Sequence, residues 1–112
     1  MEKNYEYDSD LDILHVYSKE IREGIKGCLS IGDFNIDINI DNKVVGIEIE
    51  EASKNFGLSP NILSSPDEVK LIVRKSGNSL FMGVGIIKGN IKSSTHITTS
   101  VLPQKLLTPM TN

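Results

Sequence analysis

Hydrophobic and polar residues alternate most regularly in mid-chain. Every second residue is apolar from Phe34 to Ile40 and again from Val45 to Ile49, and polar residues join the two limbs. A period of two in both limbs predicts an antiparallel β-hairpin with one buried face. Because a slip of one residue would turn the apolar set to solvent, the register must keep the faces matched. A two-residue turn centred on Asp41 and Asn42 and a four-residue turn ending at Asn42 both satisfy this condition.

Similar runs predict further strands on both sides of the hairpin. Leu11 to Tyr17 has apolar residues on both faces, which favours a central strand. Alternation and three β-branched residues between Val69 and Lys75 favour a strand over the alternative helix from Pro66 to Lys75. The remaining predicted strands are Tyr5 to Tyr7, Ile25 to Ile31, Leu80 to Lys88 and Ile91 to about Val101.

Turn and helix-start signals separate these strands. Turns are predicted at Asp8 to Asp10, at Ser76 to Asn78 and at Gly89-Asn90. Ala52 to Gly57 resembles one helical turn that ends at glycine. Both Ser59-Pro60 and the run from Ser65 to Glu68 have the Ser N-cap and following Pro of a helix start, and Glu68 would complete a capping box.

Together these elements predict a mainly β fold. We expect an antiparallel meander, sandwich-like or barrel-like, of about seven or eight strands with one or two short helical turns. Residues 1–112 would form a single domain, in which residues 1–58 are a β meander and residues 59–102 supply further strands. Residues 103–112 would be a tail that is loose or packs through Leu106 and Leu107.

The composition predicts a small aliphatic core. With 112 residues, 38% of them hydrophobic, and no Trp, the chain can bury a core without disulfides or metals. The single cysteine, Cys28, favours a reducing, cytoplasmic setting. The charged N-terminal segment lacks the apolar region of a secretory leader, and the longest near-apolar run, Leu80 to Ile87, is too short to cross a bilayer. No membrane partner is therefore expected.

Charge is distributed unevenly along the chain. Residues 1–58 include thirteen acidic and six basic residues, and residues 59–112 include two and six, although the net charge is −3. The favoured interpretation is that the two halves face each other within the fold, or between subunits, and neutralise one another. A basic strip for nucleic acid is less favoured because the pI is about 5.3 and Phe81 is the one nearby ring. That strip would consist of Lys70, Arg74, Lys75, Lys88 and Lys92.

Carboxylates gather on the polar face of the predicted hairpin. Alternation places Asp33, Asp37, Glu48 and Glu50 together, with no Lys or Arg among the alternating positions. Carboxylate oxygens suit Ca²⁺ or Mg²⁺, so Asp37, Glu48 and Glu50 are candidate metal ligands. The spacing lacks the loop ligands and the glycine of a calcium-binding loop, and a solvated acidic face is the favoured interpretation.

Two histidines and one cysteine are the other candidates for chemistry. His15 lies inside an apolar run, but no second His, Cys or nucleophile lies at a recognisable spacing, which favours a structural role. Cys28 is expected to be a buried or half-buried small hydrophobe. His96 lies in a Ser/Thr run without a nucleophile elbow, and the glycines between residues 83 and 89 lack the spacing of a phosphate-binding loop. We therefore expect neither enzymatic activity nor a cofactor.

Two motifs resemble a known family. The chain has YDSDLDILHV from Tyr7 to Val16 and VVGIEIEEAS from Val44 to Ser53. This first half resembles the prokaryotic and archaeal family called domain of unknown function 2283, although Asn42 replaces the usual turn glycine and His15-Val16 the usual Tyr-Ile. The resemblance implies a compact β-rich domain without established catalytic residues. Some relatives lie next to toxin-like proteins, which implies an antitoxin-like partner role by analogy.

The favoured function is a non-enzymatic interaction module that binds another protein, or its own copy, through an exposed sheet edge or apolar patch. One alternative is a domain that binds a divalent metal or small ligand, or a weak hydrolase, using the acidic face with His15 or His96. Another is weak nucleic-acid binding through the basic second half. Convergence of both histidines with Asp37 and Glu48 in one concave pocket would favour the ligand-binding alternative.

Overall fold

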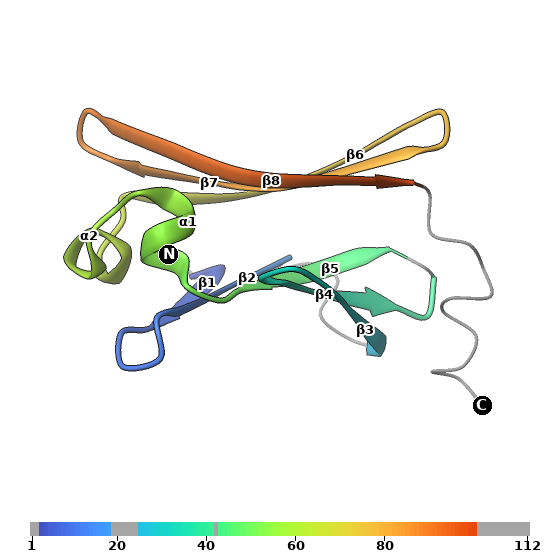
Figure 1. Cartoon of the computed structure of the whole chain (residues 1–112), viewed down its shortest axis with the longest axis horizontal. Coiled ribbons are helices and arrows are strands. Elements are labelled where there is room, and N and C mark those ends of the chain that lie inside the picture. The colour runs from blue at the N-terminus through green and yellow to red at the C-terminus, as the bar shows by residue number, and fades with distance from the viewer. Residues whose placement is uncertain (1–2, 19–24, 42, 101–112) are drawn as a thin grey trace.

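The computed structural model describes residues 3–18, 25–41 and 43–100 and forms two stacked antiparallel sheets (Figure 1). Sheet A contains β1 to β5 and sheet B contains β6 to β8, while two short helices lie between β5 and β6 in the chain. The mainly β prediction is confirmed, and the sheets are stacked rather than closed into a barrel. The element bounds are β1 Tyr5–Asp8, β2 Ile13–Tyr17, β3 Ile25–Ile31, β4 Phe34–Asn39, β5 Val44–Ile49, α1 Ala52–Phe56, α2 Pro60–Ser64, β6 Glu68–Ser76, β7 Ser79–Lys88 and β8 Ile91–Ser100.

The strand order of sheet A is β1-β2-β5-β4-β3, so β5 returns beside β2 and the sheet departs from a simple meander. As predicted, β2 is a central strand. It begins at Ile13, two residues later than expected, because Asp12 has a left-handed backbone with φ 55°. The strand order of sheet B is β6-β7-β8, a true meander. The strand prediction for residues 69–75 is thereby confirmed over the helix alternative.

The structure decides the register of the β4–β5 hairpin, which the sequence left open. Phe34 pairs with Ile49, and this register corresponds to a turn centred between residues 41 and 42. A bulge after Asp37 then shifts the register before the turn, and Ile40 lies outside the strand with 69% of its surface exposed. The buried Asn39 side chain accepts hydrogen bonds from the backbone N–H groups of residues 41 and 43, at 2.9 Å each, and so holds the turn. Asn42 lies outside the described residues.

Three other hairpins are closed by two-residue turns that begin with glycine. Gly32, Gly77 and Gly89 each have φ 57° and precede Asp33, Asn78 and Asn90. Glycine reaches positive φ without the steric cost that a Cβ atom imposes, and the hand of such turns matches the twist of the flanking strands. The turns predicted at residues 76–78 and 89–90 are therefore confirmed.

The helix predictions are partly confirmed. The first helix ends at Gly57 with φ 66°, and Ser59 caps the second helix by accepting from the Ile62 N–H, with Pro60 as its first residue. The second helix-start signal, between Ser65 and Glu68, does not begin a helix. Ser65 is the C-cap of α2, and Glu68 already pairs with β7. The β-branched residues that follow favour a strand over a helix.

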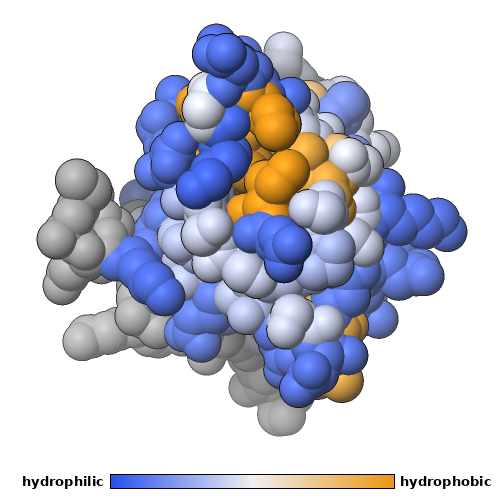
Figure 2. Space-filling model, turned by 90° about the vertical axis from the view of Figure 1, so that its left-hand side faces the viewer, coloured by the Kyte–Doolittle hydropathy of each residue, from blue (hydrophilic) through white to orange (hydrophobic). Residues whose placement is uncertain are grey.

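The core lies between the sheets, and α1 and α2 cover one end of it (Figure 1). Two polar contacts join the layers: the Asn4 side chain donates to the Val69 carbonyl at 3.0 Å, and the Ser93 hydroxyl donates to the Phe56 carbonyl. At the end that carries α2, an apolar patch is surrounded by hydrophilic residues (Figure 2). Neither helix of the described part is long and apolar enough to cross a membrane. The largest fully buried apolar residues are Leu14, Ile36, Ile38, Ile47, Ile49, Leu63, Met82 and Ile86.

Candidate functional site

The outer face of sheet A brings together most of the predicted site residues. The strand registers place Glu6, His15, Glu48 and Asn35 in one row across β1, β2, β5 and β4. Their chain neighbours in β2, β4 and β5 are buried core residues, so this row points away from sheet B. We call this surface the acidic face and define it by Glu6, His15, Asp37, Glu48 and Glu50.

His15 and Asp37 contact each other across a strand that lies between theirs. The His15 Nε2 atom lies 3.3 Å from Asp37 Oδ2. Gly46 of β5 lies beneath this contact, and a Cβ atom built there would be 3.0 Å from Asp37 Oδ2 and 3.2 Å from His15 Nε2. A side chain at residue 46 would therefore crowd both atoms, and glycine leaves room for the imidazole and the carboxylate to meet. The His15 ring also packs edge-on against Tyr17, with ring centroids 5.4 Å apart.

The other predicted carboxylates are bridged by an amide. The Asn35 Nδ2 atom donates to Glu50 at 2.9 Å and to Glu48 at 3.4 Å. The amide N–H donor is shared by the two carboxylates and offsets their mutual repulsion. Asp33 lies instead in the β3–β4 turn and accepts from the Asn55 side chain of α1 at 3.1 Å. Within the described residues, no group of three or more His, Cys, Asp or Glu side chains is arranged to hold a metal ion.

Cys28 lies on the same face in the edge strand β3, opposite Asp37. It is exposed, so the prediction of a buried or half-buried thiol is wrong: its side chain follows the polar side of the strand. Desolvation, the negative charges of Asp37 and Glu48 and a hydrogen bond to Asp37 raise the pKa of the Cys28 thiol. The carboxylate therefore lies between the thiol and the imidazole. A nucleophilic cysteine needs a neighbour that stabilises its thiolate, and this arrangement does the reverse.

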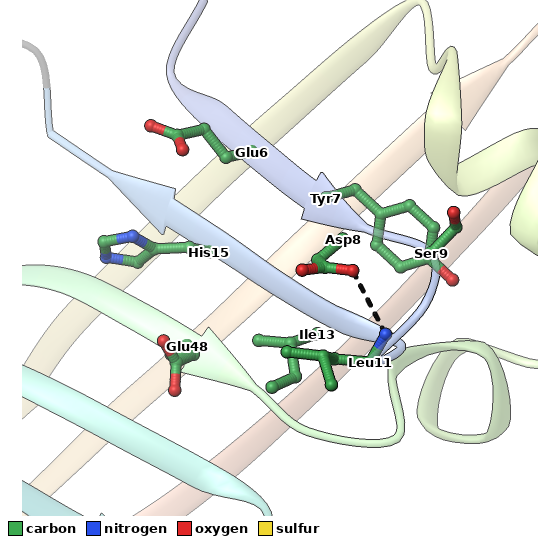
Figure 3. A pocket seen from close by; sticks show the side chains of 8 residues that line it. All are labelled: Glu6, Tyr7, Asp8, Ser9, Leu11, Ile13, His15 and Glu48. Carbon is green, nitrogen blue, oxygen red and sulfur yellow. Dashed lines mark hydrogen bonds between the residues drawn. The ribbon is translucent and has the colours of Figure 1, made fainter.

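A hollow of about 590 Å³ lies beside this cluster (Figure 3). Its wall includes His15 and Glu48, which come from adjacent strands, and Glu6 from β1. Asp37 is not part of the lining. The hollow is therefore open and acidic. His15 lines it, but its contact partner Asp37 does not.

His96 lies on the opposite side of the molecule, on the outer face of sheet B. It pairs with Gly83 and stacks on Phe81, with ring centroids 5.0 Å apart. The histidines thus do not converge on one pocket. The described ion pairs of Lys70 with Glu68 and of Lys88 with Asp67 also join residues of the same half of the chain, and so does the contact of His15 with Asp37. The prediction that the halves neutralise each other within the fold is not met by these pairs.

The carboxylate of Asp12, which no sequence pattern singles out, joins β1, the β1–β2 turn and α1. It accepts from Tyr7 Oη at 2.7 Å, from Ser53 Oγ at 2.6 Å and from the Ser53 backbone N–H at 3.0 Å. Desolvation raises the pKa of Asp12, but the hydrogen bonds from Ser53 and Tyr7 outweigh it, and the net pKa is lowered. Desolvation and the bond to Asp12 raise the pKa of Tyr7 to about 12.

Asp12 also connects the two sequence motifs in the structure. Glu51, the N-cap of α1, has φ 49° and makes no side-chain cap, so the carboxylate of Asp12 caps the helix from the β1–β2 turn. The YD motif supplies Tyr7 and Asp12, and the AS motif supplies Ser53. These motif residues therefore have a structural role in the fold. A signal was present in the sequence, since Asp is one of the few residues that tolerate a left-handed turn.

We compared the chain with known proteins. No family model, curated protein or solved structure matches it. The resemblance to domain of unknown function 2283 therefore stays a prediction based on the two motifs.

Proposed function

We propose that the chain is a non-enzymatic interaction module in which strand β8 pairs with β8 of a second copy. The non-enzymatic part is supported by the acidic face, where Asp37 separates the thiol of Cys28 from His15 and the pKa of the thiol is raised. The choice of β8 is supported by a comparison of the four sheet edges. The proposal depends on this comparison, in which β8 is the edge with the fewest protective features.

Three of the four edges have a protective feature. Strand β1 has only four residues, β3 contains a bulge between Ile25 and Gly27, and the carbonyl of Val69 in β6 already accepts from Asn4. Strand β8 has ten residues in unbroken register with β7, no Pro and Lys92 as its single charged residue. Short length, bulges, prolines and charges are the devices by which edge strands avoid pairing, and β8 largely lacks them.

The backbone donors that β8 offers can be assigned. Lys88 and Ile91 flank a two-residue turn and therefore form a hydrogen-bonded pair. Odd-numbered residues of β8 then bond to β7, and the N–H groups of even-numbered residues, including Ser94 and Thr98, point outward. Self-pairing of β8 across a two-fold axis would satisfy these donors and join two copies of sheet B. A single Lys in the strand keeps like-charge repulsion small.

The test is the oligomeric state of Thr98→Pro, measured by sedimentation equilibrium. Proline removes an outward N–H without removing a bond to β7, so we expect the dissociation constant of the dimer to rise about tenfold or more. Thr98→Ala keeps the N–H and serves as the matched control. Circular dichroism of both variants would check that they are folded.

A second readout uses the unaltered chain. Amide exchange at Ser94 and Thr98 is expected to slow as protein concentration rises, while exchange at the odd-numbered residues is already slowed by β7. A chain that stays monomeric at all concentrations, or a Thr98→Pro dimer as stable as the wild type, would show the proposal to be wrong. A dimer with fast exchange at both residues would place the interface elsewhere.

A further inference from the structure

The outer face of sheet B gathers positive charge. Met82, Val84 and Ile86 of the central strand are buried toward sheet A, so the alternate residues of β7 and their cross-strand partners point outward. The registers then place three exposed cations on this outward side. Lys70 and Arg74 of β6 lie opposite Gly85 and Phe81. Lys92 of β8 lies opposite Ile87. We call this surface the basic face and define it by Lys70, Arg74, Lys92, Phe81 and His96.

The basic face differs from the strip expected from the sequence. Lys75 pairs with the inward residue Leu80, and Lys88 forms an ion pair with Asp67 at 3.7 Å, so neither belongs to it. Among the described residues Glu68 is the one acid on this side, and it lies 3.6 Å from Lys70. The basic face therefore has a net positive charge although the whole chain is acidic.

A hollow of about 260 Å³ lies between Lys70 and Lys92. It exists because Gly85, in the strand between them, has no side chain, and a Cβ atom there would meet nothing within 4 Å. Ser94, the partner of Gly85 in β8, also lines it. Two strand spacings and an offset of two residues along the strands separate the lysines by roughly 12 Å at the backbone. A phosphate group placed over Gly85 would be within reach of both ammonium groups and of the hydroxyl.

Two rings lie on the same face beyond this hollow. Phe81 and His96 stack with an interplanar angle of 25°. Both rest over Gly83, where a Cβ atom would lie 3.2 Å from His96 Cβ and 3.4 Å from Phe81 Cε1. His96 is exposed and Phe81 is half-buried, so the pair presents an aromatic surface to solvent. Arg74 lies directly opposite Phe81 in β6.

We propose that the basic face binds single-stranded nucleic acid, with backbone phosphates held by Lys70, Lys92 and Arg74 and bases stacked on the rings of Phe81 and His96. Cations that follow a backbone beside aromatic rings are the usual means of binding single strands. A duplex hides its base faces and would not use the rings. The acidic face lies on the far side of the other sheet, beyond a Debye length of about 8 Å, and repels the ligand little.

The test is fluorescence anisotropy of the full chain with labelled oligothymidine and oligouridine. With about three phosphates neutralised, we expect a slope of log affinity against log salt of about −2, which is a loss of about twentyfold between 50 and 200 mM salt. Lys70→Glu/Lys92→Glu is expected to weaken binding about tenfold or more, and Phe81→Leu about tenfold. The control Lys43→Glu/Lys75→Glu makes the same change in net charge off the basic face and should bind as the wild type does.

Four results would overturn this proposal. The first is no binding at low salt. The second is equal weakening of binding by the control pair. The third is binding of duplex as tight as that of single strands and unaffected by Phe81→Leu. The fourth is salt-dependent self-association that Lys70→Glu/Lys92→Glu abolishes, which would assign the basic face to the acidic face of another copy. Thermal melting of each variant would distinguish a loss of binding from a loss of fold.

Discussion

A few residues with unusual surroundings determine how the elements of this chain fit together. Asp12 has a left-handed backbone, half-buried position and three donors on its carboxylate. Gly46 leaves room for one contact between two side chains. Such positions depend on neighbours that are distant in sequence. Ser53, for example, lies 41 residues from Asp12. The alternation of apolar and polar residues therefore could not predict the hydrogen bond between them.

Substitution of Asp12 tests its role in stability. Because its bonds involve an ionised acceptor, we expect Asp12→Ala to lower the free energy of unfolding by about 1.5 to 3 kcal/mol in urea titrations at neutral pH. Asp10→Ala is the matched control, because Asp10 lies in the same turn but is exposed. An equal loss in both variants would contradict a special role for Asp12.

The same bonds predict a dependence on pH. The pKa of Asp12 is lowered in the fold, so its stabilising contribution is complete above the unfolded pKa of about 3.9 and is lost as pH falls through the lower folded pKa. The difference in stability between wild type and Asp12→Ala should therefore be constant from pH 7 to about pH 5 and shrink at lower pH. A difference that grows in acid would have the wrong sign.

At the scale of elements, the hairpins follow from local sequence. Alternation and glycine-first turns predicted the strands of sheet B and the β4–β5 hairpin, because each pairing is decided by neighbouring residues. Boundaries were less predictable. The strand expected from Leu11 begins later because Asp12 adopts positive φ, and the helix start expected at Ser65 is replaced by pairing of β6 with β7.

The turns provide a test at this scale. We expect Gly77→Ala to lower the free energy of unfolding by about 1 kcal/mol, because alanine is strained at φ 57°. Gly85→Ala, at a glycine of β7 without positive φ and with open space around its Cβ position, should change it by less than about 0.5 kcal/mol. Thermal melts monitored by circular dichroism distinguish the two. Equal losses in the two variants would mean that the positive φ of the turn does not determine the loss of stability in Gly77→Ala.

At the scale of the whole molecule, sequence patterns were least informative. Nothing local specifies that β5 returns to pair with β2, or that Lys70 and Lys92 lie on either side of one glycine. The predicted site residues were divided accordingly: His15 and Asp37 meet, while His96 lies on the other sheet. The sequence also did not predict the exposure of Cys28, because which side of an edge strand faces solvent is set by the sheet that the strand joins.

The shared core predicts cooperative unfolding. All three tyrosines lie in sheet A, so their fluorescence reports on that sheet alone. Met82 belongs to sheet B but is fully buried in the common core. We expect Met82→Ala to cost about 2 to 5 kcal/mol and to shift the tyrosine and circular dichroism transitions together. Separate transitions would mean that the two sheets are independent folding units.

The opposite signs of the two outer faces give the molecule a permanent electrical polarity across its thickness. A charged polymer or surface exerts a torque on such a body before any contact is made, and rotates one chosen side toward itself. The orientation of the molecule during approach would then favour productive encounters. Added salt would lower the association rate more than it raises the dissociation rate of the complex.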